Sequence, residues 1–221
     1  MDGNGRWAKS QNLDRVEGHK QGVKVVKKVV KYCVKKEIKY LTLYTLSKEN
    51  FKRPKSELLF LFKLFVETLE NELSLLLENN IKFSVIGDLQ KIDKLVLFKL
   101  KTVEKLTVKN SSLYLNLAIS YSSRNEIVNA VKHINKSNVS ISEKTINQYL
   151  MTSFMPDPDF LIRTGGEYRI SNFLLWQIAY TELFFTKILW PDFNESHLDE
   201  AITDYKNRER RFGKTSDQIS N

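Results

Sequence analysis

The chain has 221 residues, 42% of them hydrophobic and 11% aromatic, which suits one globular domain with a full core. Lysine and arginine (35) exceed aspartate and glutamate (26) by nine, which favours an anionic partner such as nucleic acid, phospholipid headgroups or a diphosphate. The single cysteine, Cys33, cannot form an internal disulfide, so we expect a reducing compartment. No signal peptide or membrane span is predicted, since the most apolar segment, 58–77, is interrupted by Lys63, Glu67, Glu70 and Glu72.

Segments with helical and strand periodicity alternate along the chain. Apolar residues at helical spacing predict helices at 15–36, 54–79, 91–109, from 123, 142–151 and 198–211. Short β-branched and aromatic runs predict strands at 38–45, 81–86, 113–119, 160–163 and 183–185. This alternation predicts an α/β fold whose mainly parallel central sheet is flanked by helices. We expect a single domain over residues 1–213 and a polar tail at 214–221.

Residues 2–7 (DGNGRW) place two glycines in the segment that leads into the helix predicted at 15–36. Glycines permit close backbone approach, and exposed amides that lead into a helix bind anions. Arg6, Arg15 and His19 add cationic or donor groups nearby. Asp2 would repel an anion unless a cation lies between them, so the combination suggests Mg²⁺ bridging Asp2 and a phosphate oxygen. The alternative is an Asx-type turn before a helix, which the glycines alone favour.

Residues 47–54 (SKENFKRP) follow a predicted strand and end in a proline that opens the next helix. A polar segment with one aromatic residue in this place is typical of a mobile lid over a ligand. When it is taken in isolation, the segment is equally consistent with a plain solvated loop.

Residues 163–172 (RTGGEYRISN) carry two arginines around a Gly-Gly turn, with Ser171 as a candidate helix N-cap. Arginine forks match phosphate oxygens in bidentate fashion, so Arg163 and Arg169 are candidate phosphate ligands. Glu182 follows within a stretch rich in aromatic residues, where an unpaired carboxylate is unfavourable to bury. A second carboxylate beside a metal is the preferred interpretation, and a buried salt bridge is the alternative.

Several kinds of site are absent from the sequence. It holds no cysteine–histidine cluster for zinc, no G-x-x-x-x-G-K-[ST] phosphate loop and no G-x-S-x-G nucleophile elbow. It also lacks the Asp-Asp-x-x-Asp pair of the trans-type prenyl synthases, and no nucleic-acid-binding module is recognisable.

The motifs together resemble those of the cis-prenyltransferase family, above all its bacterial undecaprenyl diphosphate synthases. The matching segments follow the expected order from Met1 to Gly213: DGNGRWAK at 2–9, GH at 18–19, LTLY at 41–44, S-x-E-N at 47–50, RP at 53–54, IGD at 86–88, LN at 115–116, IRTGGE at 162–167, RISNFLLWQ at 169–177, LWPDF at 189–193 and R-x-RRFG at 208–213. Phe51 departs from the pattern, because tryptophan is usual there.

The resemblance implies a role for each matching residue. It implies that Asp2 is the catalytic carboxylate that holds Mg²⁺ and that Glu182 is a second metal-linked carboxylate. It assigns Asn50 to catalysis, where we expect an orienting role because an amide is a very weak base. The residues implied to bind the allylic diphosphate are Gly3, Asn4, Gly5, Arg6, Trp7, Arg15 and His19. Those implied on the substrate-contacting lid are Ser47, Lys48, Glu49, Phe51 and Arg53. Those implied to bind isopentenyl diphosphate are Arg163, Arg169, Ile170 and Ser171.

The resemblance also implies the reaction. It is the Mg²⁺-dependent condensation of isopentenyl diphosphate units onto farnesyl diphosphate, which yields long-chain (undecaprenyl) diphosphate, the lipid-carrier precursor for cell-wall polysaccharide. The lipid tunnel would be walled by the helix at 58–69 and closed near Leu113. A shorter-chain synthase and a non-catalytic partner subunit are the alternatives, and the intact Asp2 and Glu182 speak against the second. We expect a cytoplasmic homodimer that binds no nucleic acid and has at most peripheral contact with the inner face of the membrane.

One expectation concerns how residues 2–6 are supported. A phosphate-binding loop is normally mounted on the end of a strand, and relatives carry an apolar strand directly before DGNG. We therefore expect the first strand to be missing from this chain, which would leave a gap in the sheet with unpaired backbone groups. The α-amine of Met1 would then lie beside Asp2 and compete electrostatically with Mg²⁺.

Overall fold

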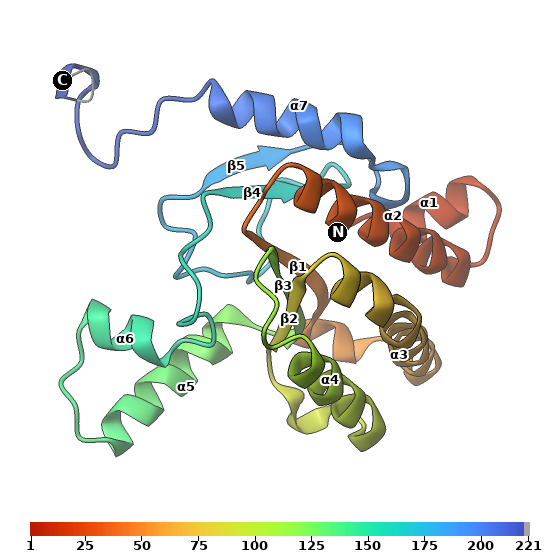
Figure 1. Ribbon diagram of the computed structural model, residues 1–221, viewed down its shortest axis with the longest axis horizontal. Coiled ribbons are helices and arrows are strands. Elements are labelled where there is room, and N and C mark those ends of the chain that lie inside the picture. Colours follow the sequence, from red (N-terminus) through yellow and green to blue (C-terminus); the bar gives the residue numbers. More distant parts are fainter. Residues whose placement is uncertain (219–221) are drawn as a thin grey trace.

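The computed structural model describes residues 1–218 as alternating strands and helices (Figure 1). The helices are α1 (Asn4–Ser10), α2 (Arg15–Lys35), α3 (Lys55–Glu78), α4 (Lys94–Leu106), α5 (Ser123–Lys136), α6 (Glu143–Tyr149) and α7 (Glu195–Lys206). The strands are β1 (Tyr40–Ser47), β2 (Ile81–Ile86), β3 (Leu113–Tyr121), β4 (Phe160–Arg163) and β5 (Glu182–Phe185). Apart from the short α1, which we did not predict, every one of these elements overlaps a predicted one.

The strands form two parallel sheets. β3 lies between β1 and β2 in the first sheet, and β4 pairs with β5 in the second. The expectation of parallel pairing is therefore confirmed for the described strands. The expectation of one central sheet is corrected, because β1 and β4 are not hydrogen-bonded to each other.

β3 is the central strand of its sheet, and its side chains reach the cores on both faces. Leu115, Leu117 and Ile119 point into the larger core with residues of α2, α3 and α4, whereas Ala118 belongs to a smaller cluster on the opposite face. Ser120 has a φ of 52°, which breaks the alternation. Tyr121, two residues after Ile119, therefore joins the smaller cluster. This burial on both faces explains why most residues of the segment are apolar or aromatic, with Asn116 and Ser120 as buried polar exceptions.

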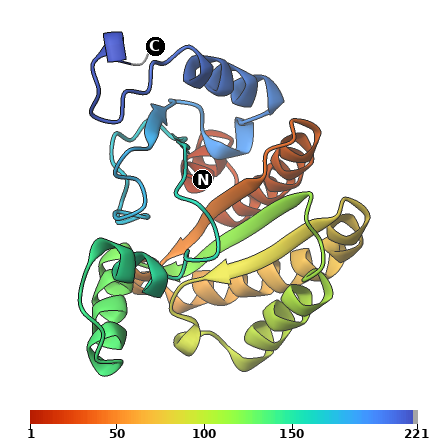
Figure 2. The ribbon, with the colours of Figure 1, turned by 60° about the vertical axis from the view of Figure 1, so that its left-hand side comes forward.

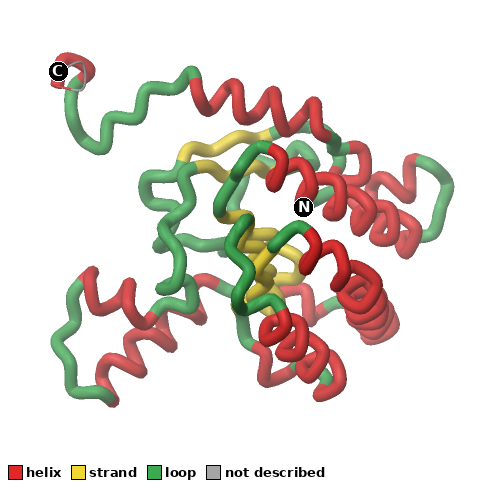
Figure 3. The backbone as a smooth tube through the Cα atoms, in the orientation of Figure 1, coloured by secondary structure: helices red, strands yellow, loops and turns green. Residues whose placement is uncertain are grey.

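Helices lie on both sides of the first sheet, and a further helix lies beside the second (Figures 1 and 3). α2, α3 and α4 lie together on one side of the first sheet, and α5 and α6 form a pair on the other side. α7 runs beside the second sheet, which stands apart from the first when the molecule is turned (Figure 2). Within residues 1–218, no helix is long and apolar enough to cross a membrane.

The segment around Ser171 differs from the prediction. Ser171 does not cap a helix, because residues 171–180 form turns. Ser171, Asn172 and Leu174 all have positive φ angles, of 49°, 62° and 48°. Such angles are disfavoured for residues with a Cβ, so contacts with the rest of the fold must determine the path of this loop.

Candidate active site

The backbone of Asp2 is held between β4 and the 3₁₀ helix η3 (Trp190–Asp192). Its N–H donates to Thr164 Oγ1 over 2.9 Å, and its carbonyl oxygen accepts from Thr164 Oγ1 and from the N–H of Trp190. Thr164 is only 2% exposed. The loop at residues 2–6 is thus fixed at the carboxyl end of β4, where ligands bind in parallel sheets.

Two guanidinium groups converge on the Asp2 carboxylate. Arg163 Nη2 lies 2.9 Å from Oδ2, and Arg6 Nη2 lies 3.2 Å from Oδ1. Partial burial alone would raise the pKa of Asp2, but the hydrogen bonds and charges of Arg163 and Arg6 outweigh it and lower the pKa below its usual value. Asp2 is therefore ionised at neutral pH, and both arginines are close to any anion that binds here.

Glycine is required at position 165 for this arrangement. Gly165 has a φ of 89°, and a Cβ there would lie 2.6 Å from Arg6 Nη2. The carbonyl oxygen of Gly165 accepts from Arg6 Nη1 over 2.7 Å. The Gly-Gly turn therefore places a backbone acceptor that orients Arg6 toward Asp2.

Arg163 also organises the loop that follows it. Its Nη1 donates to Ser171 Oγ over 2.9 Å and to the carbonyl oxygen of Arg169. The side chain of Arg169 pairs with Glu167. Arg163 thus joins Asp2 to the loop that carries Arg169, the second arginine predicted to bind phosphate.

Glu57 joins the other predicted cations. Its Oε1 lies 3.1 Å from Arg15 Nε, 3.1 Å from Arg53 Nη1 and 3.9 Å from His19 Nε2. Sequence reasoning missed this residue, although it lies four positions after Arg53 in the first turn of α3, a spacing that brings charged side chains together. Glu57 connects α2, the lid and α3 through a single carboxylate.

His19 is neutral in this setting. Burial, followed by the charge of Arg15, lowers the pKa of His19 to about 4, although the Glu57 carboxylate acts in the opposite direction. At neutral pH the imidazole is therefore a hydrogen-bonding group rather than a cation. Of the two options that the sequence left open, cationic or donor, the structure favours the second.

The predicted lid is an ordered 3₁₀ helix, η1 (Lys48–Lys52), directly after β1. Ser47 and Asn50 form a capping box, in which Asn50 Oδ1 accepts from the N–H of Ser47 and Ser47 Oγ accepts from the N–H of Asn50. Lys48 Nζ lies 2.9 Å from Asp88 Oδ2. The segment is therefore a structured element and not a plain solvated loop.

A single cavity of about 1730 Å³ connects most of these groups. Its polar end is lined by fourteen of the predicted site residues: Asp2, Gly3, Asn4, Gly5, Arg6, Arg15, His19, Ser47, Asn50, Arg53, Arg163, Arg169, Ile170 and Ser171. From there it continues between β1, α2 and α3 along apolar side chains such as Val26, Phe65 and Leu69, and it also extends between β1 and β4. A cationic mouth with an apolar interior suits a ligand with an anionic head and a hydrocarbon chain.

Five predicted site residues do not line this cavity: Trp7, Lys48, Glu49, Phe51 and Glu182. Trp7 Nε1 donates to Asp192 Oδ1 over 2.7 Å, so the indole supports η3. Phe51 packs near the Phe62 ring of α3, at 6.1 Å between centroids. Lys48 and Glu49 pair with neighbours of the lid.

Glu182 begins β5, and its carboxylate is 2.9 Å from Arg208 Nη1. The salt bridge that the sequence offered as an alternative is present, although the glutamate is only partly buried. Among residues 1–218, no three side chains of the metal-ligating types gather into a cluster. The assignment of Glu182 to a metal stays a prediction. Glu182 is paired with Phe160 at the start of β4, whereas Asp2 is bound to Thr164 at the carboxyl end of that strand.

The comparisons with known proteins agree on one family. The family model described as "Putative undecaprenyl diphosphate synthase" matches residues 1–213. An isoprenyl transferase of Nitrosomonas europaea is 47% identical over 224 residues, which cover 100% of this chain and 85% of that relative. The lavandulyl diphosphate synthase of Lavandula x intermedia, solved in complex with dimethylallyl diphosphate, superposes with a TM-score of 0.94 at 36% identity and covers 97% of this chain and 95% of its own. A "probable undecaprenyl diphosphate synthase" of Campylobacter jejuni superposes with a TM-score of 0.82 at 37% identity and covers 88% and 93%.

Parallel sheets flanked by helices, with a cationic pocket that opens into an apolar cavity, define an α/β enzyme of the prenyl-transferring class. The chain belongs to the undecaprenyl diphosphate synthase family of isoprenyl transferases, the cis-prenyltransferases. The family resemblance drawn from the sequence motifs is thereby confirmed.

Proposed function

We propose that this enzyme condenses isopentenyl diphosphate with farnesyl diphosphate to give long-chain polyprenyl diphosphate, in the cytoplasm and with at most peripheral membrane contact. The observation that carries the proposal is the polar end of the cavity, where Asp2, Arg6 and Arg163 meet beside an apolar channel. The residue roles below follow from this assignment.

The reaction breaks an allylic C–O bond, so negative charge grows on the leaving diphosphate. Arg6 and Arg15 lie at the cavity mouth, where they would stabilise that charge, and neutral His19 would donate a hydrogen bond. Arg163, Arg169 and Ser171 would hold isopentenyl diphosphate so that its double bond faces the allylic carbon. As the new C–C bond forms and the diphosphate leaves, a proton is lost from the isopentenyl unit, and a diphosphate oxygen or Asp2 would receive it. Asn50 would orient the lid, since its Oδ1 already caps η1.

Magnesium suits the donor set around Asp2. Mg²⁺ commonly binds through one or two carboxylates, waters and substrate phosphates, and Asp2 supplies an ionised carboxylate at the cavity mouth. When bound there, the ion would supply positive charge opposite the leaving diphosphate. Arg6 and Arg163 are near enough to Asp2 to transfer from the carboxylate to the phosphate oxygens.

Product length would depend on where the apolar channel ends. On β3 the cavity is lined by Leu115, Leu117 and Ile119. Leu113, the first residue of the strand, lies two positions before Leu115. Leu113 is fully buried. It is thus placed behind the cavity wall, and we propose it as the second layer of the tunnel floor. A shorter-chain product is the alternative, because lavandulyl diphosphate synthase is so similar in structure.

We also propose that the space between β1 and β4 accommodates one further parallel strand leading into Asp2. Within residues 1–218, β1 pairs only with β3 and β4 only with β5. Residues of both strands line the cavity between the sheets, and Asp2 lies at the carboxyl end of β4. Burial lowers the pKa of the Met1 α-amine to about 6, with the Asp2 charge acting against it, so at neutral pH this amine would compete only weakly with a cation.

An intact mass of the protein from its native source tests the proposed strand. A mass matching this chain, together with full activity, would show that Thr164 and Trp190 alone support the loop.

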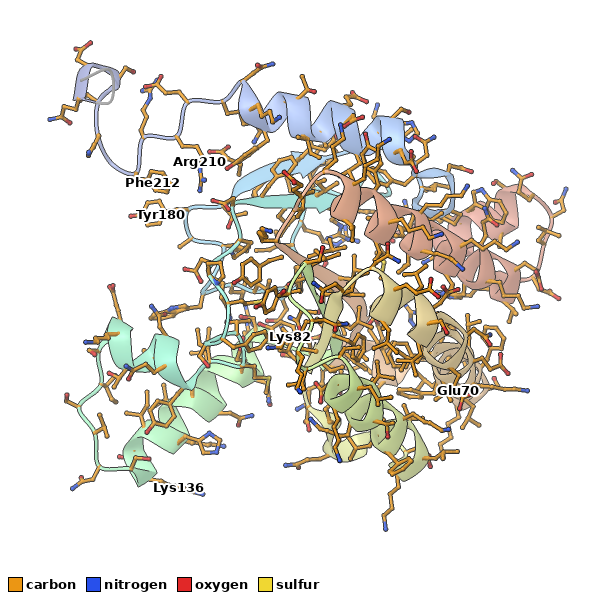
Figure 4. All side chains as sticks on the ribbon, in the orientation of Figure 1. Glu70, Lys82, Lys136, Tyr180, Arg210 and Phe212 are labelled. Carbon is orange, nitrogen blue, oxygen red and sulfur yellow. The ribbon has the colours of Figure 1, made fainter. Side chains whose placement is uncertain are left out.

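A homodimer is supported by an exposed aromatic surface near the carboxyl end of the chain. Tyr180 and Phe212 are 70% and 60% exposed, with ring centroids 6.1 Å apart. Arg210 lies over Phe212 at 4.6 Å, and Figure 4 places these three side chains together. Exposed aromatics and arginine are typical of protein interfaces. Sedimentation of the wild type and of Phe212→Ser would test the assignment.

The test of the function is incorporation of radiolabelled isopentenyl diphosphate by the purified chain, with farnesyl diphosphate as the primer. Thin-layer analysis of the dephosphorylated products would read out chain length. We expect a ladder of long products with Mg²⁺ and none with EDTA. A single short product would favour the shorter-chain alternative, and no incorporation in either condition would contradict catalysis by this chain alone.

A further inference from the structure

Three separate segments of the chain meet at Asn172. Its Nδ2 donates to Glu49 Oε1 on the lid and to Ser122 Oγ between β3 and α5, each over 2.8 Å. Its Oδ1 accepts from the N–H of Arg124 over 3.0 Å, and its backbone carbonyl oxygen accepts from the N–H of Ser123 over 3.0 Å. Both amide hydrogens and both carbonyl oxygens of Asn172 are therefore engaged.

These contacts explain how the loop after Arg169 keeps its path. Asn172 has a φ of 62°, a left-handed conformation that asparagine tolerates better than most residues. Its neighbour Ser171 accepts from Arg163 Nη1 through its hydroxyl, and its carbonyl oxygen accepts from Tyr44 Oη over 3.3 Å. With Asn172 bound to the start of α5, the Ser171 hydroxyl and the Arg163 guanidinium are held in register.

We propose that Asn172 is a positioning residue that couples the lid to the isopentenyl diphosphate site. On one side it fixes the loop that presents Arg169 and Ser171, and on the other its amide holds Glu49 of η1. A lid held in this way would lie over the same loop that binds the second diphosphate. The inference rests on the proposed function, since it takes that loop to bind isopentenyl diphosphate.

The chemistry of the contact requires an amide at position 172. Burial raises the pKa of the Glu49 carboxyl, but hydrogen bonds, first of them that from Asn172, lower it below its usual value. Glu49 is therefore charged at neutral pH. An Asn172→Asp change would keep the acceptor for the Arg124 N–H and could accept from the Ser122 hydroxyl, yet it would place a second carboxylate against Glu49. The substitution thus removes one contact and largely preserves the rest.

The experiment is a double-mutant cycle on the full-length enzyme. Asn172→Asp should raise the KM for isopentenyl diphosphate by about tenfold, the scale of one hydrogen bond to a charged group, with a smaller change in the KM for farnesyl diphosphate. In the double variant that also carries Glu49→Gln, the new amide Nε2 at position 49 can donate to the new carboxylate at position 172. The KM of this double variant for isopentenyl diphosphate should therefore lie within about threefold of the KM of Glu49→Gln alone. Asn147→Asp is the matched control, because it adds the same charge on α6 and keeps the acceptor for Trp176 Nε1.

Glu49→Asp withdraws the carboxylate from Asn172 without changing charge and leaves the loop untouched, so it keeps the test valid if Asn172→Asp folds poorly. It should produce the same selective rise in KM. An unchanged KM in both Asn172→Asp and Glu49→Asp, or a defect that Glu49→Gln fails to relieve, would overturn the coupling. Failure of the proposed function is distinguishable, since the wild-type enzyme would then not incorporate isopentenyl diphosphate at all.

Discussion

Asp2→Ala should have two effects of opposite sign. Asp2 accepts from Arg6 at 3.2 Å and from Arg163 at 2.9 Å, and its side chain is 36% exposed. Without the carboxylate, Arg163 loses its carboxylate partner and Arg6 keeps only Glu167, 3.6 Å from its Nη1, so both guanidiniums become more available to an anion. A hydrogen bond to a charged group is worth roughly 1.5–3 kcal/mol, and partial exposure favours the lower end. Metal-free pyrophosphate should therefore bind about tenfold more tightly than to the wild type.

Turnover should change in the other direction. Loss of one preorganised charge-stabilising group reduces the rate by roughly 10²-fold or more, so Asp2→Ala should be nearly inactive with Mg²⁺ although it binds pyrophosphate better. Calorimetry in EDTA measures the first effect, and isopentenyl diphosphate incorporation measures the second. Asp14→Ala is the control, because Asp14 is exposed and makes no side-chain cap bond. Turnover within a few-fold of the wild type, or unchanged pyrophosphate affinity, would refute the role given to Asp2.

Three further predictions follow from the site and its cavity. Arg169→Ala should raise the KM for isopentenyl diphosphate roughly 10-fold or more through loss of a phosphate contact, and an effect confined to the allylic substrate would mean that the two sites are exchanged. Leu113→Ala should lengthen the products on thin-layer analysis and lower the free energy of unfolding by about 2–5 kcal/mol. Leu100→Ala, equally buried but on α4, no residue of which lines the cavity, should lower stability alone, so unchanged products with Leu113→Ala would place the floor elsewhere. The pKa of His19 is about 4 in the folded chain and about 6.5 when unfolded, so the unfolded state takes up the proton first and stability should fall as pH drops from 6.5 to 4. Chemical unfolding across that range should show a loss of up to about 3 kcal/mol from this group, and a His19→Gln variant with the same pH slope would contradict it.

The local elements of the fold could be read from the sequence because their signals lie between near neighbours. The strands at 81–86 and 160–163 agree with the structure residue for residue, since each is a short segment rich in aliphatic and aromatic residues and bounded by polar or glycine residues. Helix α1 was missed because seven residues containing a glycine and a tryptophan give too short a pattern. Family membership was equally accessible, because ordered motifs carry it along the whole chain.

The partners of the site residues could not be read in this way. Trp7 was predicted to line the substrate site, yet its indole binds Asp192, and Glu182 was preferred as a metal ligand, yet Arg208 holds its carboxylate. Both residues have the right chemistry for the predicted role. Their contacts depend on which segment folds beside them, and no local pattern records that.

The sequence by itself therefore determined most of the secondary structure, the parallel pairing and the residue types at the phosphate-binding end. The tertiary structure decided which of those residues meet. Asp2 and Arg163 are 161 positions apart, and Asn172 reaches Glu49 across 123. Periodicity is a property of neighbouring residues and the single backbone they share, whereas these contacts exist only after strands have paired and helices have packed, so their geometry belongs to the folded chain as a whole.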